Sequence, residues 1–128
     1  MKEIIFLTLA EVIEIHSDQM ERYGGINGIR DISLLSSAVA MPYATFSGDF
    51  LHRGIFVMAA GYAFHISQNH PFVDGNKRTA IASALVFLAL NGVDVADPDE
   101  KLYGSMMQTA SGKMTKEEFA AVLRDLVE

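Results

Sequence analysis

The sequence predicts an all-α fold: a single-domain bundle of about six helices around a central buried helix at residues 76–91. Two observations carry this prediction. Apolar residues recur at helical spacing in segments that open on helix-capping residues and close on Gly or Asn. The stretch from Thr79 to Leu90 carries no charge on any face, and such a helix belongs in the interior of a fold. Because half of the 128 residues are apolar, residues 1–128 are expected to form one domain with one core.

The first two helices are expected before residue 42. Glu11 follows Thr8 at the spacing of a capping box, and the helical pattern then continues to about Tyr23. The Gly-rich turn that comes next ends this helix. Asp31 is expected to cap a short second helix that ends near Pro42, because the residue before a proline avoids helical backbone angles.

An irregular segment and two long helices are expected in the middle of the chain. Residues 41–50 contain alternating aromatic side chains and a Ser-Gly-Asp turn, which predicts an extended or irregular segment, a small flap. Residues 51–69 show one apolar helical face and predict a long helix. The central helix is expected to begin near Asn76 and to end at Asn91-Gly92, a pair typical of helix C-termini.

Two further helices are expected near the C-terminus. Asp97 is expected to cap a helix that has Pro98 in its first turn and extends to about Ala110. Thr115 and Glu118 repeat the capping-box pattern ahead of a final amphipathic helix.

Composition limits the classes of function. The formal net charge is −6, whereas a protein that mainly binds the nucleic-acid backbone usually presents a basic face, so no direct nucleic-acid partner is expected. The absence of cysteine excludes disulfides and thiolate metal sites and fits a reducing compartment. The longest apolar run is well short of the about 20 residues that span a bilayer, so no membrane partner is expected. A soluble, cytoplasmic protein is predicted.

Three of the four histidines are interpreted as ordinary helix or core residues. His16, His52 and His65 are scattered, and no pair has the spacing of a helical metal site such as His-Glu-x-x-His. The fourth histidine belongs to the densest group of polar residues, directly before the central helix. This group reads His70-Pro71-Phe72-Val73-Asp74-Gly75-Asn76-Lys77-Arg78. Since the first N–H groups and the positive dipole end of the helix lie beside it, the group predicts an anion site.

The beginning of this group suits phosphate chemistry at a hydroxyl. Histidine accepts protons near neutral pH, so His70 is expected to take the proton of an incoming alcohol. Asp74 is expected to hold a magnesium ion through one carboxylate, with phosphates and water completing the coordination shell. Phe72 is expected to fix the loop to the core, because an aromatic side chain buries a large area.

The end of the group suits phosphate binding. Gly75 lets a phosphate approach the backbone, and Asn76 offers an amide donor at the start of the helix. Lys77 and Arg78 are expected to neutralise phosphate oxygens. The segment is not a P-loop, because the Gly-Lys pair of that motif and the Gly ahead of it are missing. The candidate catalytic residues are His70, Asp74 and Arg78.

The spacing His70-x-Phe72-x-Asp74-Gly75-Asn76-x-Arg78 resembles the signature of the Fic/Doc family, in which such a loop and helix bind a nucleotide. The form usual in Fic adenylyltransferases has a Gly at the position of Lys77 and an Arg at the position of Ile81. Both departures resemble the Doc branch, the toxins of death-on-curing modules. The resemblance extends over nearly the whole chain: the length fits as well, and the shared motifs run from Arg22-Tyr23-Gly24-Gly25 to Asn91-Gly92.

The resemblance implies a toxin of a toxin–antitoxin module that is a protein kinase. With ATP and Mg²⁺ it would transfer the γ-phosphoryl group to a hydroxyl of a target protein in the translation machinery, such as an elongation factor. Lys77 is expected to obstruct the nucleotide pose for AMP transfer and to favour one that presents the γ-phosphate to His70. Adenylyl or another nucleotidyl transfer by the same loop is the alternative, and a non-catalytic scaffold that binds a partner is a third.

The resemblance also implies control by a partner. Many Fic relatives carry an inhibitory helix with a Ser/Thr-x-x-x-Glu-Gly/Asn motif, whose glutamate pairs with the final Arg of the signature. No glutamate of this chain is followed by Gly or Asn, and Ile81 replaces that arginine. Inhibition is therefore expected in trans, by an antitoxin whose disordered tail folds on binding.

Overall fold

The computed structural model describes residues 3–128, which form six α-helices, one short 3₁₀ turn and one two-stranded hairpin. The helices are α1 (Leu9–Tyr23), α2 (Ile32–Ala40), α3 (Ile55–Asn69), α4 (Asn76–Leu90), α5 (Lys101–Ala110) and α6 (Lys116–Asp125). Between α2 and α3 lie the 3₁₀ turn η1 (Met41–Tyr43) and the strands β1 (Thr45–Phe46) and β2 (Asp49–Phe50). The predicted fold of about six helices is confirmed.

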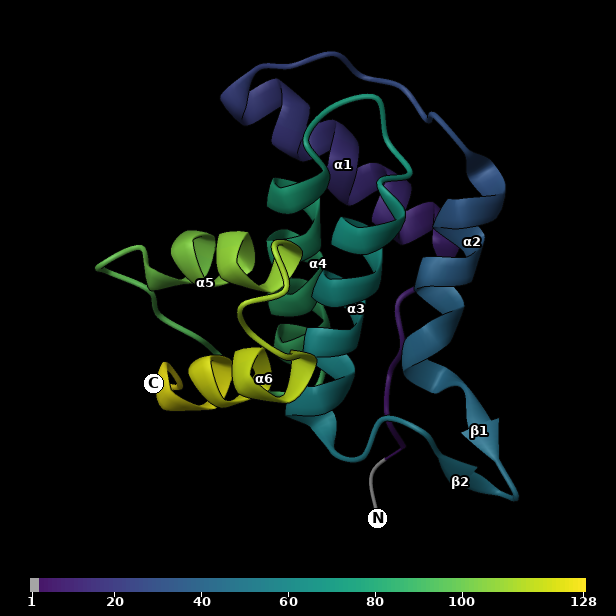
Figure 1. The fold of residues 1–128 in the computed structure, drawn as a ribbon, viewed down its shortest axis with the longest axis vertical. Helices are drawn as coiled ribbons and strands as arrows, with labels where there is room; N and C mark the ends of the chain where they lie inside the picture. Colours follow the sequence, from purple (N-terminus) through teal and green to yellow (C-terminus); the bar gives the residue numbers. More distant parts are fainter. Residues whose placement is uncertain (1–2) are drawn as a thin grey trace.

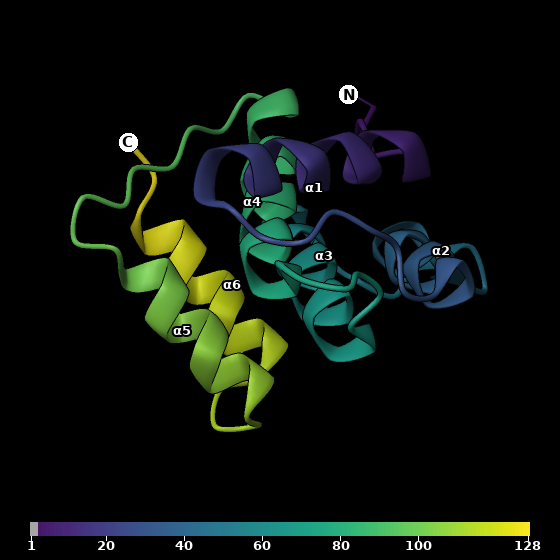
Figure 2. The same cartoon turned by 90° about the horizontal axis from the view of Figure 1, so that it is seen from above.

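The helices α3 and α4 lie side by side in the middle of the bundle (Figure 1). The helix α3 packs against α2, η1, α4, α5 and α6, whereas α4 packs against α1, α3 and α5. Seen from above, α5 and α6 flank this pair on one side and α2 lies on the other (Figure 2). Within residues 3–128, no helix has both the length and the apolar character needed to cross a membrane.

The central position predicted for α4 is occupied by α3 and α4 together, and one face of α4 is exposed to solvent. Four small residues of α3, Ala59, Ala60, Gly61 and Ala63, are buried and let neighbouring helices approach closely. Of the apolar residues of α4, Phe87 is fully buried, whereas Val86 and Leu90 are 37% and 40% exposed. Lack of charge alone therefore overstated the burial of α4.

The predicted N-caps of α1, α2 and α6 are confirmed. Thr8 with Glu11, and likewise Thr115 with Glu118, exchange both hydrogen bonds of a capping box. The carboxylate of Asp31 accepts a hydrogen bond of 3.0 Å from a backbone N–H in the first turn of α2. These contacts are local, which is why sequence spacing identified them.

Two helices begin later than predicted. The helix α3 starts at Ile55 instead of Leu51, because Gly54 directly before it has a φ of +92°, outside the right-handed helical region. The N-cap of α5 is Glu100 and not Asp97 as predicted, although the carboxylate of Asp97 accepts the N–H groups of the first two helical residues, at 2.8 and 2.9 Å. Because those residues begin at Lys101, Pro98 lies in the preceding turn and not in the helix.

A cluster of three basic side chains joins α3, α6 and the loop after the hairpin. Lys116 Nζ lies 2.9 Å from Nε2 of His52 and 3.0 Å from Nε2 of His65. The ammonium donates to both rings, which leaves both imidazoles neutral with their protons on Nδ1. Burial, followed by the charge of Lys116, lowers the pKa of His65 to about 4 and also lowers that of His52. These two histidines, interpreted from the sequence as ordinary helix or core residues, thus share one lysine.

We expect the folded state to lose stability as the pH falls from about 6.5, the usual pKa of histidine, towards about 4. In this range the unfolded chain binds a proton at His65 and the folded chain does not. The stability that the folded state owes to this difference is fully present above the unfolded pKa and is lost progressively as the pH falls below it. Urea unfolding at several pH values measures the effect. The non-titrating variant His65→Gln should show a shallower decline, and equal slopes for the two proteins would contradict the prediction.

Candidate functional site

The loop that connects α3 to α4 is held in place from inside the core. The side chain of Phe72 is fully buried, as predicted for the residue that fixes this loop. The ring of His16 stacks on it with the centroids 3.8 Å apart and the planes at 3°. His16 Nε2 also lies 2.8 Å from the carbonyl oxygen of Asp74, and since a carbonyl only accepts, Nε2 carries the proton.

His16 is a residue of the site that the sequence interpretation missed. It lies on the buried face of α1, one turn after Val12 and one turn before Met20. A single polar residue on an otherwise apolar helix face needs a hydrogen-bond partner, and that partner is the loop. The position of His16 in the helical pattern was the available signal.

Asn76 lines the site, but its amide holds the loop. Its Oδ1 accepts the N–H of Phe72 at 2.9 Å, and its Nδ2 donates to the Phe72 carbonyl at 3.0 Å. The amide N–H of Asn76, which was expected to be free for a phosphate, therefore donates to the loop backbone in this structure. The groups left for an anion are backbone N–H groups at the start of α4, which no side chain caps.

Arg30 fixes the backbone at His70 from forty residues away. Its guanidinium donates to the carbonyl of His70 at 2.7 Å and to that of Asn69 at 3.0 Å, so it satisfies carbonyls at the C-terminus of α3. His70 ends α3 in a left-handed conformation with φ +50° and ψ +53°, which is uncommon for a residue with a side chain. Its imidazole is exposed. Nothing in the local sequence pattern indicated Arg30.

A cavity of about 240 Å³ opens at the N-terminus of α4. It brings together all the predicted site residues, which are His70, Asp74, Gly75, Asn76, Lys77 and Arg78. Gly75 is the N-cap with φ +76°, and a Cβ atom at this position would collide with Met20. Two cations and the positive helix end thus face one small polar cavity, an arrangement that suits a phosphate group.

The carboxylate of Asp74 ties the loop to the turn after α1. One of its oxygens accepts the N–H of Gly75 at 2.9 Å, and the other accepts that of Ile26 at 3.2 Å. The residue is exposed, so each oxygen keeps a lone pair for a ligand. No cluster of three or more His, Cys, Asp or Glu that could hold a metal occurs in residues 3–128. A lone carboxylate fits an ion such as Mg²⁺, which takes most of its ligands from phosphates and water.

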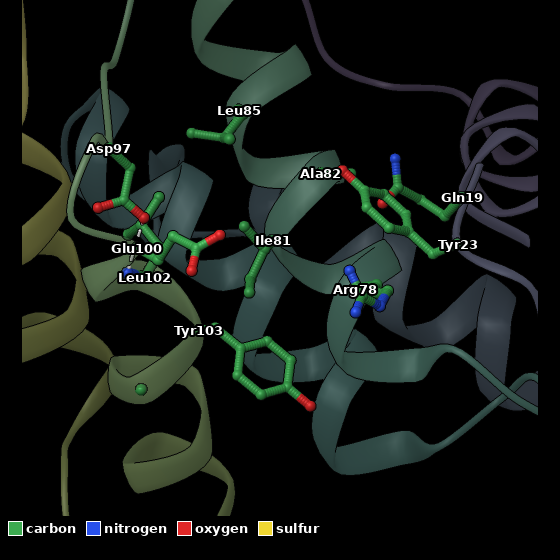
Figure 3. Close-up of a pocket in the computed structure, with 11 residues that line it drawn as sticks. Gln19, Tyr23, Arg78, Ile81, Ala82, Leu85, Asp97, Glu100, Leu102 and Tyr103 are labelled. Carbon is green, nitrogen blue, oxygen red and sulfur yellow. Dashed lines mark hydrogen bonds between the residues drawn. The ribbon is translucent and has the colours of Figure 1, made fainter.

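A larger cavity, of about 500 Å³, adjoins the first at Arg78 and Tyr103. The guanidinium carbon of Arg78 lies 4.1 Å from the ring centroid of Tyr23 and 5.9 Å from that of Tyr103, distances typical of cation–π contacts. Figure 3 shows Arg78 and Tyr23 on one side of this cavity and Ile81 of α4 near its centre. Neither tyrosine was expected at the site.

The charges of the larger cavity are divided between its two ends. Asp97 and Glu100 lie on the side away from Arg78 with Leu85 above them, and Ile81 lies between the two ends (Figure 3). The Asp97 carboxylate also accepts two backbone N–H groups at the start of α5, which fix its position. The arrangement places a basic end beside the phosphate-sized cavity and an acidic end that repels phosphate.

Comparison with known proteins matches residues 6–88 to the family model described as Fic/DOC family. Over 116 residues the chain is 34% identical to Protein kinase doc of Escherichia phage P1, covering 91% of this chain and 90% of that protein. Over 74 residues it is 45% identical to Toxin Doc of Mycolicibacterium smegmatis, covering 58% of this chain and 57% of that protein. The family match includes α1 to α3, the loop with His70 and most of α4. The chain therefore belongs to the Fic/DOC family.

Proposed function

We propose that this chain is a Doc-like toxin and a protein kinase, which transfers the γ-phosphoryl group of ATP to a hydroxyl of a target protein. The observation that carries the proposal is the cavity at the start of α4, where Lys77 and Arg78 line the same space as His70 and Asp74. The names of the two relatives, a toxin and a protein kinase, support it. A target in the translation machinery and an inhibitory antitoxin partner belong to the same proposal.

The residues divide the work as follows. The N–H groups at the start of α4, with Lys77 and Arg78, bind and orient the phosphates. His70 accepts the proton of the target hydroxyl. At the same time the hydroxyl oxygen bonds to the γ-phosphorus, and the bond from that phosphorus to ADP breaks. Asp74 would hold Mg²⁺, which neutralises phosphate charge when bound. The hydrogen bonds from Asn76, His16 and Arg30 keep the loop in position and thus serve orientation.

The larger cavity is the proposed place for the nucleoside of ATP. Arg78 borders both cavities, so a nucleotide with its phosphates at α4 extends past Arg78 towards Ile81 and Leu85. Apolar side chains and the two tyrosine rings suit a base, and the carboxylates of Asp97 and Glu100 suit hydroxyl and amino donors. This orientation leaves the terminal phosphate on the side of His70.

The position of the label in ATP distinguishes the two transfer reactions. The purified chain is incubated with a cell extract and with ATP labelled at either the γ- or the α-phosphate. We expect protein-bound label from γ-labelled ATP only, because Lys77 disfavours the pose for AMP transfer. Lys77→Gly is the matched variant and should lower the γ-transfer. Transfer of the α-label by the unaltered chain would replace the kinase proposal with nucleotidyl transfer, and no transfer of either label would favour the scaffold.

We expect Asp74→Asn to raise the Mg²⁺ concentration that gives half-maximal transfer, because the substitution removes the carboxylate charge. The asparagine carbonyl still accepts one backbone N–H, so part of the tie to Ile26 or Gly75 survives. Transfer rates over a Mg²⁺ titration measure the effect, and urea unfolding checks that the stability is retained. An unchanged Mg²⁺ dependence would count against Asp74 as the ligand.

A further inference from the structure

Lys116, the first residue of α6, lies outside the proposed phosphate site and contacts two histidines instead of a carboxylate. Its ammonium touches Nε2 of His52 and of His65, and it lies 5.1 Å from the ring centroid of Phe64. The one ion pair within 4.0 Å among residues 3–128 is Arg22–Asp18, so no carboxylate holds the charge of Lys116 at that range.

The surroundings of Lys116 destabilise its charged form. Burial lowers its pKa below the usual value for lysine, and the neighbouring carboxylate of Glu117 opposes this only in part. Two neutral imidazoles accept hydrogen bonds from it but supply no negative charge. A lower pKa raises the fraction of unprotonated amine, which is the nucleophilic form because only it carries a free lone pair.

The geometry also leaves room for a reagent. Once two N–H bonds point to the two rings, the lone pair of the neutral amine points away from both. Lys116 lines a cavity of about 620 Å³ between α3, the end of α5 and the start of α6, together with Phe64, Gln68 and Thr115. This cavity shares no lining residue with the two cavities at α4.

We propose that Lys116 is a site of covalent acylation by small acyl phosphates such as acetyl phosphate. The amine nitrogen attacks the carbonyl carbon, a C–N bond forms, and the bond from that carbon to the phosphate oxygen breaks as phosphate leaves with the electron pair. Conversion of the ammonium to the amide releases two protons, one to the leaving phosphate and one to water, while the two imidazole nitrogens hold the amine through its N–H groups.

Acylation at this position changes how α6 is attached. The amide has no charge and one N–H, so it can donate to only one of the two imidazoles. The other Nε2 then loses its donor. This loss is costly at His52, because this residue is only 3% exposed and its buried Nδ1 already has no partner. The modification thus weakens the link between α6, α3 and the loop after the hairpin.

Site-resolved mass spectrometry of the full chain treated with acetyl phosphate tests this proposal. Lys113 is the internal control, because it is exposed and lies three residues earlier. At pH 7 we expect Lys116 to be acetylated several-fold faster than Lys113. The difference should shrink as the pH rises past about 10.4, where exposed lysines also lose their protons. A Lys116 rate equal to or below that of Lys113 at pH 7 would overturn the proposal.

The variant His65→Gln tests the role of the imidazoles. It removes one of the two imidazoles that hold the amine, so the rate at Lys116 is expected to fall towards that of Lys113, with the rate at Lys113 unchanged. An undiminished advantage in this variant would overturn the assignment of the imidazoles as the groups that hold the amine. If the variant unfolds, the pH profile of the unaltered chain still decides whether Lys116 is the preferred site.

Discussion

His70→Ala is expected to lower the rate of phosphoryl transfer about 10²–10⁴-fold, the usual contribution of a general base. The imidazole is exposed at the cavity, and Arg30 holds the backbone carbonyl, which the substitution leaves in place. Urea unfolding should therefore change little. Steady-state transfer of the γ-label, with ATP in excess, measures the loss.

His70→Asn is the matched control for this variant. Asparagine tolerates the left-handed backbone conformation of His70 better than alanine does, but it is not a base. Both variants should lose activity to a similar extent if the imidazole accepts the proton. Full activity in the asparagine variant would show that the alanine variant fails for conformational reasons, and His70 would lose its assigned role.

Phe72→Ala is expected to lower the free energy of unfolding by about 3–5 kcal/mol, the usual effect of removing a large buried ring. The side chain is fully buried and stacks on His16, so the substitution leaves a cavity under the loop. Activity should fall as well, because the same loop carries His70 and Asp74. Urea unfolding monitored by circular dichroism measures the change.

An exposed phenylalanine provides the comparison for Phe72. Phe46 on the hairpin is 73% exposed, and Phe46→Ala is expected to change the stability by no more than about 0.5 kcal/mol. Phe72→Leu should lie between the two alanine variants, since it keeps part of the apolar volume. A Phe72→Ala effect as small as that of Phe46→Ala would mean that the loop does not depend on this ring.

The sequence by itself determined the features of this protein that rest on local interactions. The capping boxes at Thr8 and Thr115 and the cap at Asp31 each join residues three positions apart, so their spacing is visible along the chain. The same holds for the group from His70 to Arg78, because a single loop and the first turn of one helix bring those side chains to one cavity. The late starts of α3 and α5 were missed, since they depend on positive φ angles at Gly54 and Glu100.

Only the tertiary structure decided which distant residues hold and extend the site. His16 reaches the loop across 58 residues, Arg30 reaches His70 across 40, and Lys116 reaches His52 across 64. Tyr23 and Tyr103 meet Arg78 only because α1, α4 and α5 converge. Hydrogen bonding and aromatic stacking act over a few ångströms in space, and helical periodicity specifies which face of a helix is buried but not which residue of another helix it meets.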